Sequence, residues 1–147
     1  MRTPASIDGH PIHPMLVVFP LGLWFFSLAC DLISLAVAAP AVWATVAFYT
    51  MAGGLIGALA AAVPGLIDLL YYKGGAPPVK KIALTHMAIN LTVVVLYAVN
   101  IWLRTSDQEG RGIPIILSVI GVCMITVSGW LGGQMVHVYG VGVEKRE

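Results

Sequence analysis

Four long apolar segments dominate the hydropathy pattern of the chain. They cover approximately residues 15–37, 41–67, 82–103 and 113–138, and short polar or proline-containing segments separate them. A helix needs about 20 apolar residues to cross a bilayer, so each segment is long enough to span a membrane. We therefore predict an all-α fold, an integral membrane four-helix bundle, with residues 1–147 forming a single four-span domain.

Composition supports a membrane protein. Hydrophobic residues make up 59% of the chain and charged residues only 10%, whereas a soluble domain is roughly 45–50% apolar and about 25% charged. The net charge is +1 and there is no basic patch, so we expect the lipid bilayer as partner and no nucleic acid. Cys30 and Cys123 both lie in apolar segments, and we interpret them as small buried side chains.

The distribution of Lys and Arg predicts the orientation. With four spans, both termini and the segment between the second and third spans share one face. That face carries Arg2, Lys73, Lys80, Lys81, Lys145 and Arg146, and the opposite face carries Arg104 and Arg111. Cytoplasmic segments are enriched in Lys and Arg, so we expect both ends of the chain to be cytoplasmic (N-in, C-in) in a multi-pass protein of the bacterial inner membrane.

The four histidines are the best candidates for chemistry, because this topology puts all of them on the face of the membrane that carries the termini. His10 and His13 belong to the opening motif Gly9-His10-Pro11-Ile12-His13-Pro14, in which each histidine precedes a proline and is biased toward extended backbone. His86 and His137 lie within the third and fourth spans. Ionisable groups at membrane depth are rare unless they serve a site, and neutral imidazole is the commonest side-chain ligand of haem iron and transition metals.

Our first hypothesis is a small membrane redox protein, a b-type cytochrome that transfers electrons. We expect His86 and His137 to be the axial ligands of haem b, because both lie on transmembrane helices at similar depth. His10 and His13 would then serve a second haem, a quinone or a proton route. Helix bundles commonly hold such cofactors between facing helices.

Two alternatives remain open. One is a non-haem transition-metal site formed by His10, His13, His86, His137 and Asp68. Asn90 and Gln134 would accept or donate the outer hydrogen bonds that orient metal-bound imidazoles. The other is a structural subunit of a larger membrane complex without a cofactor of its own. A redox protein partner and a homo-oligomer are both compatible with the sequence.

Two further features accompany the histidines. Gly53, Gly57, Ala61 and Gly65 recur every fourth residue in the second span, a face of small residues that allows another helix to approach closely. Asp31 lies in the first span toward the opposite face, where an ionised carboxylate is costly, and a role in a proton path is one interpretation.

The run from Gly9 to Gly22, which begins with the histidine–proline motif, resembles the signature of a bacterial membrane-protein family known as domain of unknown function 2231. The resemblance covers nearly the whole chain, including Asp68, the region around His86 and the end that carries His137. It implies four spans. Val18 stands where we expect many relatives to carry another histidine. Some members are fused to Rieske iron–sulfur or cytochrome-like domains, which implies electron transfer by association only.

Overall fold

The computed structural model describes residues 3–72, 77–106 and 112–143. It consists of two short strands followed by five helices, with bounds β1 Ser6–Ile7, β2 His10–Pro11, α1 Ile12–Leu16, α2 Val18–Ala36, α3 Pro40–Tyr71, α4 Pro77–Thr105 and α5 Gly112–His137. Four helical stretches are long and apolar enough to cross a membrane: Ile12–Ala36, Pro40–Tyr71, Pro78–Thr105 and Gly112–His137. The prediction of an all-α membrane four-helix bundle is confirmed.

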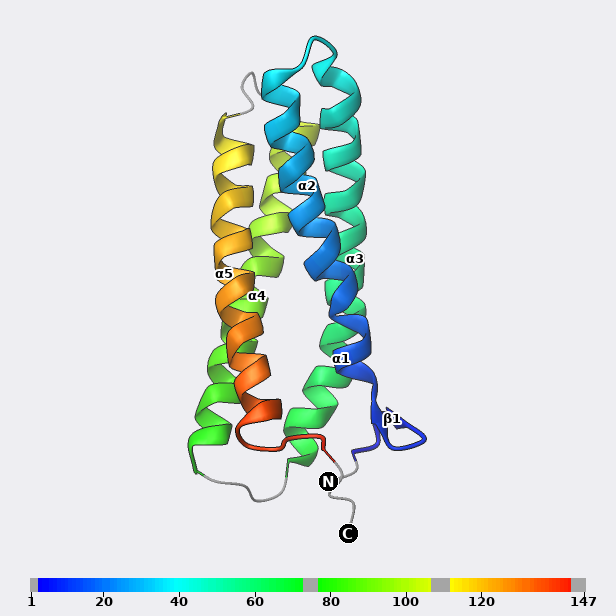
Figure 1. Ribbon diagram of the computed structural model, residues 1–147, viewed down its shortest axis with the longest axis vertical. Helices are drawn as coiled ribbons and strands as arrows, with labels where there is room; N and C mark the ends of the chain where they lie inside the picture. Colours follow the sequence, from blue (N-terminus) through cyan, green and yellow to red (C-terminus); the bar gives the residue numbers. More distant parts are fainter. Residues whose placement is uncertain (1–2, 73–76, 107–111, 144–147) are drawn as a thin grey trace.

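The four long helices form two hairpins that lie side by side (Figure 1). α2 packs extensively along α3, and α4 along α5, whereas contacts between the hairpins are fewer. α2 and α4 run in one direction, and α3 and α5 return in the other. Both ends of the chain therefore lie at the same end of the bundle, which we call the terminal end; the opposite one is the far end.

Two helices are longer than the hydropathy pattern predicts. α3 continues to Tyr71, so Asp68 lies inside the helix, and α4 begins at Pro77. The physical reason is that hydropathy marks only the part of a helix that lies in hydrocarbon, whereas the helix itself continues into the polar interface. Lys80 and Lys81, both exposed, lie in this extension of α4. The other cations used to predict the orientation, except Arg104, fall outside the described residues.

A small β-hairpin precedes the first helix. β1 and β2 pair antiparallel, with Ile7 opposite His10. The two residues between them, Asp8 and Gly9, both have positive φ, 48° and 80°, as a type I′ turn requires. His10 is extended, as its following proline predicts, but His13 lies in the first turn of α1. Pro14 is compatible with that turn because the first N–H groups of a helix have no partner within the helix.

Large apolar side chains cover the outside of the bundle, where lipid tails replace water as the surrounding medium; they include Leu35, Ile56, Leu70, Val95, Trp102 and Trp130. The centre is aromatic. Trp24 and Tyr97, both almost fully buried, stack with ring centroids 4.2 Å apart and planes 9° from parallel. This stack joins α2 of one hairpin to α4 of the other.

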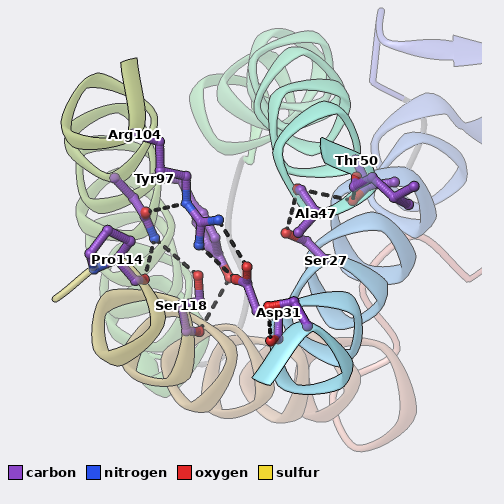
Figure 2. Close-up of polar contacts among 11 residues, drawn as sticks. Ser27, Asp31, Ala47, Thr50, Tyr97, Arg104, Pro114 and Ser118 are labelled. Carbon is purple, nitrogen blue, oxygen red and sulfur yellow. Dashed lines mark hydrogen bonds and ion pairs between the residues drawn. The ribbon is translucent and has the colours of Figure 1, made fainter. Parts of the chain in front are cut away.

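A buried ion pair joins the same two helices nearer the far end. Arg104 donates to both carboxylate oxygens of Asp31, at 2.8 and 2.6 Å, and Figure 2 shows the two side chains directed at each other between α2 and α4. Arg104 Nε also donates to Asn100 Oδ1 at 2.9 Å, and Asn100 in turn donates to the Pro114 carbonyl and to Ser118 Oγ. The side chains of Asp31 and Arg104 are only 3% and 13% exposed. Every charge in this network is paired, as burial in a membrane requires.

This arrangement revises two expectations from the sequence. Arg104 contributes to the interior of the bundle and not to a polar connecting segment. Asp31 is satisfied by a guanidinium group, and its partner lies 73 residues away in the chain. The sequence alone does not pair these two residues, because hydropathy does not show which faces of two helices meet.

Exchanging the two charges tests this pair. Asp31→Arg alone places two guanidinium groups in one buried position, and we expect it to cost on the order of 3–5 kcal/mol of stability. Adding Arg104→Asp restores opposite charges and should recover most of that loss. Thermal unfolding in detergent, followed by circular dichroism, measures the effect. A double variant no more stable than Asp31→Arg alone would show that the two residues do not stabilise the bundle as a pair.

Candidate functional site

Two of the four histidines lie next to each other. His13, in α1, and His86, in α4, have ring centroids 6.2 Å apart and perpendicular planes. His13 Nδ1 lies 2.8 Å from the carbonyl oxygen of Ala61, and His86 Nδ1 lies 2.9 Å from that of Ser128. A carbonyl oxygen only accepts hydrogen bonds, so Nδ1 carries the proton in both rings and Nε2 carries the lone pair. Each ring is thus held by main chain in the tautomer that leaves Nε2 as ligand or base.

His86 also belongs to a closed network of side chains. Asn90 Nδ2 donates to His86 Nε2 at 2.9 Å, and Ser128 Oγ donates to Asn90 Oδ1 at 3.0 Å. Ser128 Oγ also lies 2.9 Å from His86 Nδ1. Both nitrogens of this imidazole therefore have partners, and its orientation is fixed from two sides.

Glycines make room for both imidazoles. A Cβ atom on Gly65 of α3 would lie 2.8 Å from His13 Nδ1, closer than real side chains approach. A Cβ on Gly132 of α5 would lie 3.4 Å from His86 Cε1. Each ring thus packs on a glycine of the helix that also supplies its carbonyl acceptor. Part of the small-residue face predicted in the second span serves to accommodate a side chain.

Two aromatic rings nearer the centre of the bundle are held in the same way, by a glycine and a main-chain carbonyl. Trp24 Nε1 donates to the Met51 carbonyl at 3.2 Å, and Tyr97 OH donates to the Ser118 carbonyl at 3.4 Å. A Cβ on Gly54 would lie 2.5 Å from the Trp24 ring, and one on Gly121 would lie 2.7 Å from the Tyr97 ring. In both hairpins an aromatic ring packs on a glycine and donates to a carbonyl three residues before that glycine.

These contacts correspond residue by residue between the two hairpins. Asp31 and Arg104 are 73 residues apart in the sequence. The same separation relates three further pairs: His13 and His86, Trp24 and Tyr97, and Ser27 and Asn100. Their carbonyl acceptors correspond in the same order, from Ala61, Met51 and Ala47 to Ser128, Ser118 and Pro114. Because the hairpins run in the same direction, an approximate two-fold axis along the bundle relates them.

Counterparts meet each other on this axis. His13 faces His86 at the terminal end, Trp24 stacks on Tyr97 at the centre, and Asp31 binds Arg104 toward the far end. Within each of the spans Ile12–Ala36 and Pro78–Thr105, the three positions are separated by 11 and then 7 residues. At 3.6 residues per turn, these spacings are about three and two turns, so all three side chains lie on one face of the span.

The structure places the other predicted site residues elsewhere. His10 is exposed on β2, and its Nδ1 donates to the Asp8 carbonyl at 3.0 Å. His137 is the exposed last residue of α5, and Gln134 is partly buried in the last turns of the same helix. Asp68 accepts a hydrogen bond from Thr3 Oγ1. His137 lies five residues beyond Gly132, on which the His86 ring packs. Pairing of His86 with His137 stays a prediction, and the imidazole that the structure brings beside His86 is that of His13.

The donor set at this site consists of two imidazoles. Within residues 3–72, 77–106 and 112–143, no three or more His, Cys, Asp and Glu side chains come together in a way that holds a metal ion. The two cysteines are separate free thiols, one buried and one exposed.

Reasoning from the sequence missed Ser128 and the link between Asp31 and Arg104. It singled out Gly65 as part of a helix-packing face but did not pair it with His13. A signal was present. The 11-residue spacing between a histidine and an aromatic residue occurs in the first and third spans, and the same spacing between two glycines occurs in the second and fourth. A search for an internal repeat, and not for hydropathy alone, would have aligned the two halves.

Comparison with known proteins gives a family but no closer relative. No curated protein and no solved structure matches the chain significantly. A family model described as "Predicted membrane protein (DUF2231)" matches residues 9–145, which include both hairpins and all four histidines. The chain therefore belongs to the DUF2231 family of predicted membrane proteins.

Proposed function

We propose that this protein is a small membrane redox protein that binds one haem b between His13 and His86. The observation that carries the proposal is the matched pair of imidazoles, 6.2 Å apart, each donating Nδ1–H to a main-chain carbonyl. Axial histidines need an available Nε2 and a partner for the other nitrogen that fixes the ring. Both rings meet the second requirement, and His13 Nε2 has no hydrogen bond from a described residue.

The number of donors favours haem over a bare ion. Zinc and similar ions in proteins are usually held by about three or four side chains, whereas the described part of the chain brings two imidazoles together. Haem supplies four nitrogens of its own and needs only axial ligands from the protein. A planar macrocycle on the approximate two-fold axis would also meet equivalent groups from both hairpins. Ligation by His86 would replace the hydrogen bond that Asn90 donates to its Nε2.

In this proposal the terminal end of the bundle faces the bacterial cytoplasm. Six of the eight Lys and Arg residues belong to the segments of that end. One of the remaining two, Arg104, is neutralised inside the bundle by Asp31, which strengthens the imbalance used by the positive-inside rule. Electrons would be exchanged with a redox protein partner at this side of the membrane, because the site lies in the terminal half.

Absorption spectra of the detergent-purified protein, produced with adequate haem and recorded oxidised and dithionite-reduced, test the proposal. We expect a sharp Soret band and split visible bands on reduction. His13→Ala and His86→Ala should each abolish this low-spin spectrum, because each removes one axial ligand. His137→Ala is the matched control and should leave it unchanged.

A featureless spectrum of the wild-type protein would rule out the haem proposal. A spectrum that His137→Ala abolishes and His13→Ala leaves intact would instead establish the axial pair His86 and His137. Elemental analysis of a colourless preparation would then distinguish a bound transition-metal ion from a subunit without a cofactor.

Two glycine variants test the packing of the ligands. Gly65→Ala places a methyl group 2.8 Å from His13 Nδ1 and must displace that ring, whereas the methyl group of Gly132→Ala lies 3.4 Å from His86. We expect Gly65→Ala to lower haem affinity by about tenfold or more, the usual loss when the outer support of a ligand is disturbed. Gly132→Ala should stay close to wild type. Haem titration followed at the Soret band measures both, and equal affinities would contradict a site at His13.

A further inference from the structure

The two histidine half-sites differ, although their main-chain contacts correspond. Asn90 lies four residues after His86, and the equivalent position after His13 is Val17. Ser128, which contacts both His86 and Asn90, corresponds to Ala61. Among the residues that the structure describes, the polar network around His86 therefore has no counterpart around His13.

Because of this difference, His86 Nε2 must lose a hydrogen bond before it can bind iron, whereas His13 Nε2 has none to lose from a described residue. His86 Nε2 accepts a hydrogen bond from Asn90 at 2.9 Å, and Ser128 Oγ holds Asn90 in place through its Oδ1 at 3.0 Å. The side chains of Val17 and Ala61 offer no such donor to His13. A partly buried hydrogen bond that must be broken opposes ligation, by a factor of about two to ten for one net bond. Within the described part of the chain, this penalty falls on His86 and not on His13.

We infer that His86 is the exchangeable axial position and His13 the permanent one, an inference that rests on the proposed haem site. Asn90 is a positioning residue that competes with iron for the His86 lone pair. A small neutral ligand such as carbon monoxide would take the place of His86 Nε2, which would then accept again from Asn90. No electron or proton is transferred in this exchange.

The chemistry of the half-site defines the ligand class. His86 packs on Gly132 of α5, and the amide of Asn90 is a neutral donor beside it. Because Asn90 holds the displaced imidazole as a neutral group, the exchange involves no change of charge, which suits a small uncharged ligand. The His13 half-site, with Val17 and Ala61 in the equivalent positions, supplies only the ring.

Carbon monoxide binding to the dithionite-reduced, haem-loaded protein tests the inference. Asn90→Val copies Val17 into the second half-site and should lower carbon monoxide affinity about two- to tenfold, because His86 no longer has an alternative partner. Val17→Asn is the reciprocal variant and should raise the affinity, because it gives His13 a competitor. The reduced low-spin spectrum without added ligand should persist in both. Unchanged affinity in Asn90→Val would overturn the inference.

Ser128→Ala provides a second variant in case Asn90→Val does not fold. It copies Ala61, keeps the main-chain carbonyl that holds His86, and removes only the hydroxyl group that orients Asn90. We expect it to lower carbon monoxide affinity in the same direction. An affinity equal to that of wild type would count against Asn90 as a competitor.

A measurement without haem separates this inference from the proposed function. In the haem-free protein with ¹⁵N-labelled histidine, Asn90→Val should shift the Nε2 resonance of His86 and leave that of His13 in place. A wild-type protein that shows this shift but never binds haem would disprove the proposed function while confirming the hydrogen bond. A haem-binding protein in which Asn90→Val shifts neither resonance would keep the proposed function and overturn the inference.

Discussion

The buried ion pair between Asp31 and Arg104 is the constraint on which the rest of the bundle depends. Two charges in a membrane interior are tolerated only when they meet, and these two lie on α2 and α4, which belong to different hairpins. Their contact fixes the rotation of both helices. Because His13, Trp24 and Asp31 share one face, as do His86, Tyr97 and Arg104, the same rotation stacks the two aromatic rings and brings the two imidazoles together.

The approximate symmetry of the hairpins explains how opposite charges come to face each other. In a dimer of two identical hairpins, a residue on the two-fold axis meets its own copy, so this position would hold two carboxylates or two guanidinium groups. Joining both hairpins in one chain allows the two positions to differ. Asp31 and Arg104 use that freedom to form a pair, and Asn100, the counterpart of Ser27, accepts a third hydrogen bond from the guanidinium group. The two hairpins therefore have the same packing contacts but carry different charges at the position of Asp31 and Arg104.

Hydropathy and charge were sufficient to predict the number of spans and the all-α bundle, and the opening motif was sufficient to indicate the family. These properties depend on composition and local pattern. Which histidines meet could not be predicted, because it depends on the rotation of each helix about its axis, and two histidines at similar depth are equally consistent with many rotations. His137 and His86 matched in depth, but His13 shares with His86 the spacing to an aromatic residue and to a charge. Hydropathy predicts how deep in the membrane a residue lies. The spacing that the two hairpins share indicates which side of the helix it is on.

The order of the pairs along the axis determines which side of the membrane the histidines can reach. Trp24 and Tyr97 are 1% and 0% exposed and lie between the imidazoles and the ion pair. A stacked pair of large rings packed against glycines leaves little space for water, and the paired charges beyond it offer no free group to carry a proton. A proton moving from the far end toward His13 and His86 therefore meets two barriers, the aromatic stack and a neutralised ion pair. In the proposed redox role, these two layers would separate the cofactor from the far side of the membrane and so oppose a proton leak across the bundle.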